Sequence, residues 1–406
     1  MDERKQTPAR PGWEIALSLI FAALSVAGIL WGLWNLHPET APAETARVTA
    51  AADVAGQVGR YARSAKAVAF TGIAAAPYVE PDPEPVHYVI PEGDLVAPAP
   101  DPACYGSLGI DRAAEVLDVI QTARDSGLLG EQDVIFDPGV EFYPGSEIRY
   151  YCDDTILVVC WKELISNTVC SCVEVKLADA SQFRRKIVDD TFGSPVKLFA
   201  TSLAKSTNAV VAMNADFYMF RDFGIMAYQR QLYRFSETAY SGGFQKYNCI
   251  DTLLIDGSGS FHYFHRGDTA TWEEMQHYID ENDILFSISF GPILIEHGEV
   301  QTCTAYPAGE WNTGYSRAGL GQFDELHYFY MNVNHEPGRP ARWTVNTFAE
   351  HMYEKGLREA YCLDGGQTGE IVFQGVPYNH IDFGEEREVS DIIYFATAIP
   401  ETEETP

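Results

Sequence analysis

Pairs of short apolar runs around a turn recur in this chain, and they constrain its fold more than any other feature. Leu253–Ile255 and Phe261–Phe264 flank Asp256–Ser260, a turn that contains two glycines. The same arrangement recurs at 293–300 and at 371–376. Apolar runs of this length around glycine-containing turns are typical of β-hairpins. The chain is therefore expected to build much of its core from antiparallel strands.

Single strands and a few helices complete the expected fold. Amphipathic helical spacing occurs at 111–128 and at 345–355, the second with Thr344 as N-cap and Gly356 as its stop. Further strands are predicted at 155–160, 173–177, 209–213 and 326–333. Many hairpins with few helices predict an α+β domain, a mixed and mainly antiparallel β-sheet with flanking helices.

An uncharged apolar run near the N-terminus predicts a transmembrane helix. Residues 15–36 reach the length of about 20 residues that a helix needs to cross a bilayer. Three basic residues lie within 1–14 and only Arg47 follows closely, a bias that favours a cytoplasmic N-terminus. The competing interpretation is a cleaved signal peptide, with Ala-Pro-Ala at 41–43 as its cleavage signal. Either way, the rest of the chain is expected to be extracellular.

The expected organisation is an anchor, a spacer and a globular domain. Residues 1–14 form a cytoplasmic tail before the single transmembrane helix. Residues 37–103 are Ala-rich and then rich in proline and acidic residues, which favours an extended linker. The domain spans 104–400, and 401–406 form an acidic tail.

Composition excludes two classes of protein. Asp and Glu total 58 against 28 for Lys and Arg, a formal net charge of -30, which would repel nucleic acid. A hydrophobic share of 46% excludes a disordered chain. The eight cysteines contain no C-x-x-C pair, so we interpret them as buried small hydrophobic residues, with disulfides as the alternative. Metal ligands are the least favoured reading, and no metal site or cofactor is expected.

Polar side chains stand out in four places, three of them beside apolar strands, and rigid strands are suited to positioning such groups. These candidates are Asn214, Asp216 and Arg221; Asp364, Gly365 and Gly366; Arg387 and Asp391; and Arg317 before a glycine-rich turn. A carboxylate pair such as Asp216 and Asp364 suits glycosidic bond cleavage. Arginines such as Arg317 and Arg387 suit a phosphate. Taken singly, each motif is also an ordinary turn or loop, and Arg387 could pair with a neighbouring glutamate.

The order of these motifs makes the set recognisable. Residues 150–396 resemble the phosphodiester glycosidase family, with six landmarks in the family's order. The landmarks are Ala212–Tyr218, Gly224–Arg234, Ser289–Leu294, Arg317–Gly321, Leu363–Gly366 and Arg387–Tyr394. The fifth resembles the start of the family's Leu-Asp-Gly-Gly-Gly-Ser-Ser, but here Gln367-Thr368-Gly369 follows. A second departure is 334–339, which replaces the family's usual Asp-Gly-Arg.

The resemblance implies hydrolysis of a sugar 1-phosphodiester, in a phosphodiester-linked sugar or polysaccharide of the bacterial envelope or extracellular space. Asp216 or Asp364 would activate water or attack the anomeric carbon. The implied substrate-binding residues are Asn214, Arg221, Arg317, Gly365, Gly366, Arg387 and Asp391, with Arg317 and Arg387 on the phosphate. The alternatives are a glycan-binding or envelope-structural protein without turnover, and a metal-dependent phosphodiesterase that cuts the P–O bond.

Overall fold

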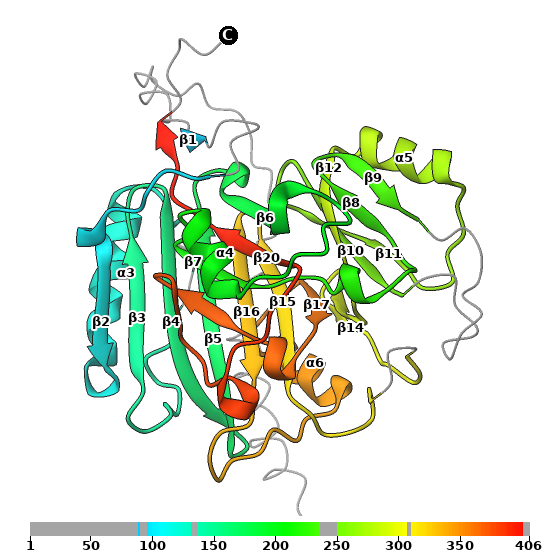
Figure 1. The fold of residues 1–406 in the computed structure, drawn as a ribbon. Coiled ribbons are helices and arrows are strands. Elements are labelled where there is room, and N and C mark those ends of the chain that lie inside the picture. Colours follow the sequence, from blue (N-terminus) through cyan, green and yellow to red (C-terminus); the bar gives the residue numbers. More distant parts are fainter. Residues whose placement is uncertain are drawn as a thin grey trace, which may run out of the picture. The chain divides into compact units, whose positions relative to one another are not determined.

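A nine-stranded antiparallel sheet forms one wall of the core (Figure 1). The computed structural model describes residues 88–89, 96–130, 133, 136–235, 250–306 and 310–400. In spatial order the strands are β14 (Glu299–Val300), β13 (Ile293–Glu296), β17 (Glu359–Leu363), β15 (Arg317–Asp324), β16 (His327–Val333), β5 (Thr168–Leu177), β4 (Ile156–Ile165), β3 (Glu147–Cys152) and β2 (Tyr105–Gly109).

Two five-stranded antiparallel sheets complete the walls of the core. One has the order β19 (Val376–Pro377), β18 (Ile371–Phe373), β7 (Val211–Asn214), β20 (Asp391–Phe395) and β6 (Phe183–Ile187). The other has the order β11 (Phe261–Phe264), β10 (Thr252–Asp256), β12 (Ile284–Ser289), β8 (Met226–Tyr228) and β9 (Gln231–Arg234). A separate pair joins β1 (Tyr88–Val89) to β21 (Ile399–Pro400).

Among the described residues, four α-helices cover the outer faces of these sheets. They are α3 (Val116–Asp125), α4 (Ala200–Ser206), α5 (Trp272–Glu281) and α6 (Val345–Glu354). Short 3-10 turns are η1 (Pro102–Cys104), η2 (Ile110–Glu115), η3 (Ala180–Gln182), η4 (Val188–Asp190), η5 (Tyr218–Phe220), η6 (Gly366–Thr368) and η7 (Asp382–Gly384). Figure 1 shows α4 lying against β7 and β20.

Side-chain alternation along β4 shows how the layers are held together. Ile156 and Val158 point into the core shared by the three sheets. Leu157 and Val159 point to the opposite face of the nine-stranded sheet, into a second core that includes α3 and α6. Because successive side chains of a strand face opposite sides, a continuous apolar run fits a strand that is buried on both faces.

The observed elements confirm the α+β, mainly antiparallel fold. The three predicted hairpins are β10–β11, β13–β14 and β18–β19. Helix α6 begins after Thr344, whose hydroxyl accepts a bond from the N–H of Thr347, as the N-cap prediction requires. The helix predicted at 111–128 is instead the turn η2 followed by α3, because Arg112 departs from helical backbone angles.

The predicted tail, transmembrane helix and acidic tail (1–14, 15–36 and 401–406) lie outside the described residues. Within the described part, no helix has the length and apolar character needed to cross a membrane. Part of the predicted linker 37–103 is described. Ala97 is buried there, and its main chain exchanges hydrogen bonds with Thr207 and Asn208.

The described cysteines fit the interpretation as small hydrophobic residues. All seven have free thiols, and Cys249 lies outside the described part. Five of the seven are buried in the sheets or beneath α6: Cys160, Cys170, Cys172, Cys303 and Cys362.

Candidate active site

A pocket of about 120 Å³ lies where the end of β17 meets the ends of β7 and β20. It is therefore built at the junction of the nine-stranded sheet and one five-stranded sheet. Its lining combines acids, a cation, amide and hydroxyl groups with two phenylalanines: Asn214, Asp216, Phe217, Phe220, Asp364, Thr368, Arg387, Val389 and Ser390. Four of the residues predicted from the sequence are thus brought together here.

Asp364 is placed by a turn that requires glycine. It follows β17, and a Cβ on Gly365 would lie 2.7 Å from the main-chain oxygen of Ser316. Gly366 has a φ of +70°, in the left-handed region that favours glycine. The turn η6 follows, and in it the Thr368 hydroxyl donates a hydrogen bond to the main-chain oxygen of Gly365 at 2.9 Å. The carboxylate is consequently fixed at the end of a rigid strand.

The environment of Asp364 suits a base. Burial raises the pKa of its carboxyl, while the nearby Thr368 hydroxyl and the positive charge of Arg387 act in the opposite direction. The net effect is a raised pKa. A carboxylate of raised pKa accepts a proton from water more readily than an ordinary one.

Asn214 joins the two sheets beneath the pocket. Its side-chain amide donates to the main-chain oxygen of Asp364 at 2.7 Å. Its own oxygen accepts a bond from the Tyr330 hydroxyl, also at 2.7 Å. Both bonds are made to protein, so Asn214 acts on Asp364 by holding its main chain in place.

Two cations flank an exposed ring at the mouth of the pocket. Phe220 is 47% exposed. The Lys197 ammonium lies 4.2 Å and the Arg387 guanidinium carbon 5.5 Å from the centre of its ring. Within the described part of the chain, neither cation forms an ion pair with a carboxylate. An anion entering the pocket would therefore meet two positive charges.

Behind the pocket, four charged side chains form a cluster with no solvent exposure: Arg185, Asp216, Arg221 and Asp391. Arg221 binds the two carboxylate oxygens of Asp216 from Nε at 3.2 Å and from Nη2 at 2.8 Å. Arg185 contacts Asp391 Oδ2 with Nε and Nη2, both at 2.6 Å. The Ser289 N–H donates to Asp216 at 3.0 Å. The two arginines and two aspartates thus form ion pairs with one another in the interior of the protein.

Three predicted site residues make their side-chain contacts within this buried cluster: Asp216, Arg221 and Asp391. The side chain of Asp216 is fully buried, so the small exposure of this residue, 7%, comes from its main chain. Arg221 also donates to the main-chain oxygens of Phe223 and Ile225. Asp391 accepts bonds from the Ser390 hydroxyl and the Asp216 N–H. These contacts favour a positioning role for all three.

Arg317 does not join the residues that line the pocket. Its main chain lies next to Gly365, but its guanidinium donates to three main-chain oxygens. They belong to Glu310, Thr313 and Trp343, at 2.8, 2.7 and 3.2 Å. Arg317 therefore ties loops together beside the strand that carries Asp364.

The two departures from the family motif support the turn after Asp364. Thr368 stands where the family motif has its first serine, so a hydroxyl is kept at this position. Gln367 donates to the main-chain oxygen of Glu385 at 3.2 Å. Asn334 donates to the main-chain oxygens of Gly369 and His380 at 3.1 and 2.8 Å.

A buried acid next to this turn makes stability depend on pH. Glu370 is 1% exposed, and burial together with the neighbouring Glu386 raises its pKa from 4.5 to about 8. The folded protein thus holds this proton more tightly than the unfolded chain does. The resulting stabilisation is complete below pH 4.5 and is lost as the pH rises through about 8.

We expect Glu370→Gln to remove this contribution, because an amide stays neutral at every pH. Urea unfolding of the wild type between pH 5 and pH 9 should show a fall on the order of 3 kcal/mol that the variant lacks. Glu385→Gln, an exposed neighbour, is the control and should keep the wild-type slope. An equal slope in wild type and Glu370→Gln would contradict the assignment.

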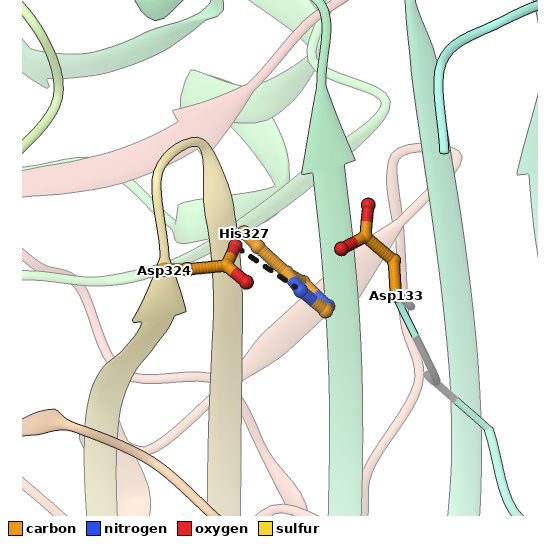
Figure 2. A group of neighbouring side chains, drawn as sticks. All are labelled: Asp133, Asp324 and His327. Carbon is orange, nitrogen blue, oxygen red and sulfur yellow. Dashed lines mark ion pairs between the residues drawn. The ribbon is translucent and has the colours of Figure 1, made fainter. Parts of the chain in front are cut away.

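A second cluster has the shape of a metal site but the chemistry of an ion-pair network (Figure 2). Asp133, Asp324 and His327 are the one such group among the described residues. The Lys176 ammonium lies 3.5 Å from Asp133 and 3.7 Å from Asp324. Burial lowers the pKa of His327, but its bonds to Asp324 and Glu174 dominate and raise it to about 9. Metal ligation needs a neutral imidazole, so a protonated His327 disfavours a metal here.

Sequence reasoning missed six residues of the pocket and its mouth: Lys197, Phe217, Phe220, Thr368, Val389 and Ser390. The Thr368 hydroxyl could have been found from its place in the glycine-rich motif. Lys197 precedes α4 in a segment without any motif, and only the fold places it beside Phe220.

Comparison with known proteins agrees with the motif order. Residues 207–396 match the family described as phosphodiester glycosidase. This range contains every site residue predicted from the sequence, whereas Lys197 precedes it. A comparison with curated proteins finds no match.

Solved structures of low identity are also similar. The catalytic domain of zebrafish N-acetylglucosamine-1-phosphodiester alpha-N-acetylglucosaminidase, auto-inhibited by its pro-peptide, is 15% identical with a TM-score of 0.44, covering 59% of this chain and 82% of that one. A hypothetical protein from Synechocystis is 12% identical with a TM-score of 0.44, covering 61% and 63%. An exported protein from Burkholderia pseudomallei is 11% identical with a TM-score of 0.36, covering 56% and 74%. Residues 207–396 of this chain, just under half of its length, therefore match the phosphodiester glycosidase family that the motifs resemble.

Proposed function

We propose that this protein hydrolyses a sugar 1-phosphodiester by cleaving the bond between the anomeric carbon and the phosphate oxygen. The observation that carries the proposal is the pocket itself, which is lined by the Asp364 carboxylate and by Arg387, with Lys197 packed on Phe220 beside it. The family assignment supports the same class of substrate. We further propose that the domain is exported and tethered by residues 15–36, on the strength of their uncharged sequence.

The pocket divides the chemistry between its two ends. Asp364 takes a proton from water, and the water oxygen forms the new bond to the anomeric carbon. The bond to the phosphate oxygen breaks, and its electron pair stays on the phosphate. Arg387 and Lys197 stabilise that charge. The products are a free sugar and a phosphomonoester. Phosphate is a good leaving group, so a second carboxylic acid is not required.

The direct test is release of free sugar from an N-acetylglucosamine 1-phosphodiester by the full chain in detergent. Release that withstands a chelator supports the proposal. Phosphomonoester release that a chelator abolishes would favour the metal-dependent phosphodiesterase. Binding of the diester without any product, by folded protein, would favour the glycan-binding alternative.

The cations should be needed for turnover. We expect Arg387→Ala and Lys197→Ala each to lower kcat/KM by about a hundredfold, because each removes a charge that stabilises the leaving phosphate. Arg387→Lys should recover part of the loss. Arg339→Ala is the matched control, since Arg339 is a half-buried arginine that contacts Asn167 and does not line the pocket. Unchanged kcat/KM in both alanine variants would contradict the placement of the substrate's phosphate beside Lys197 and Arg387.

A further inference from the structure

Exposed apolar side chains gather beside the pocket. Within four consecutive residues, three large apolar side chains are exposed: Val196 to 42%, Leu198 to 38% and Phe199 to 42%. Together with Phe220 they form what we call the apolar rim. Single exposed apolar residues are common on protein surfaces, but a contiguous group is typical of a binding site.

The apolar rim is continuous with the pocket. The main chain of Leu198 pairs with Val389, which lines the pocket, through bonds of 3.2 and 2.8 Å. Lys197 separates Val196 from Leu198 in the chain, and its ammonium packs against Phe220, which also lines the pocket. A ligand leaving the pocket would thus pass the two cations and then meet apolar surface.

The sequence of pocket, cations and apolar rim would suit an amphiphilic ligand, which has a polar group, an anionic group and an apolar chain in that order. The rim lies next to Lys197 and Arg387, in a chain whose formal net charge is -30. A neutral or basic apolar partner would gain nothing from those cations, whereas a molecule with a phosphate between a polar group and an aliphatic chain would contact every part.

We propose that the alcohol esterified to the substrate's phosphate is lipid-like, so that the sugar occupies the pocket, the phosphate binds Lys197 and Arg387, and an aliphatic chain lies on the apolar rim. This inference rests on the proposed function and specifies its substrate class. Hydrolysis adds the water hydroxyl to the anomeric carbon and leaves a lipid phosphate with the electron pair of the broken bond.

The test compares two esters of N-acetylglucosamine 1-phosphate, one with methanol and one with decanol below its micelle concentration. The full chain should hydrolyse the decyl ester with a kcat/KM at least about tenfold higher, because burial of apolar surface adds binding energy. Leu198→Ser and Phe199→Ser should each lower kcat/KM on the decyl ester about fivefold or more and leave the methyl ester unchanged.

These variants are chosen to keep the fold. Phe199 is the N-cap of α4 and makes no side-chain capping bond, and serine is a favoured N-cap residue. Leu198 makes its strand-like bonds through the main chain. Leu117→Ser is the matched control, because Leu117 on α3 is 43% exposed and does not line the pocket.

Failure of this inference is separable from failure of the proposed function. Equal kcat/KM for both esters, with serine variants like wild type, overturns the lipid-like substrate and leaves the glycosidase intact. If neither ester is hydrolysed, calorimetry with decyl phosphate and methyl phosphate decides the inference alone. Tighter binding of decyl phosphate that Leu198→Ser weakens supports it, and equal binding overturns it.

Discussion

Replacing Asp364 with asparagine should lower kcat/KM on a sugar 1-phosphodiester by about a thousandfold and leave the fold intact. The carboxylate lies in the pocket with a pKa raised by burial, whereas the side chain of Asp216, the other acid that lines the pocket, is fully buried against Arg221. Asparagine keeps the size of the side chain, but it cannot take a proton from water.

The measurement is steady-state hydrolysis, with the unfolding temperature recorded on the same samples. Asp222→Asn is the control, because it removes an exposed carboxylate from the segment after Asp216. Wild-type activity in Asp364→Asn would exclude Asp364 as the base. A loss of activity accompanied by an equal loss of folded protein would show a structural role instead.

The part of the fold that follows from local signals was predictable from the sequence. In the hairpin β10–β11, the Asp256 carboxylate accepts bonds from the N–H groups of Ser258 and Ser260, so the turn is specified by its own residues. Strand β6 could not be found this way, since three of its five residues, Arg184 to Lys186, are basic. Arg185 is nevertheless buried, because Asp391 of the neighbouring strand β20 neutralises it.

For the candidate site, the sequence likewise predicted which residues come together but not where their side chains point. The order of motifs brings Asn214, Asp364 and Arg387 to one pocket, as the sequence analysis expects. It could not show the direction of each side chain. The Arg317 side chain donates hydrogen bonds to three main-chain oxygens outside the pocket, and the Asp216 carboxylate accepts hydrogen bonds from Arg221. Such choices depend on partners that only the folded chain brings close.

Replacing Asp216 with asparagine should, by contrast, act on stability. It leaves Arg221 buried without its carboxylate partner, while Arg185 keeps its ion pair with Asp391. Removing one partner from a buried ion pair is strongly destabilising, so we expect urea unfolding to show a loss of about 3–5 kcal/mol. Arg221→Gln should lower the free energy of unfolding by a similar amount, because it removes the other partner of the Asp216–Arg221 ion pair.

The comparison with Asp364→Asn decides between the two carboxylates. If Asp216 positions the pocket, the molecules of Asp216→Asn that remain folded should keep a kcat far above that of Asp364→Asn. An Asp216→Asn variant with wild-type stability and no activity would reverse the assignment, with Asp216 as the reacting group and Asp364 as its support. Activity per folded molecule, measured at a temperature where both variants are folded, separates these results because the cluster reaches the pocket only through main chain.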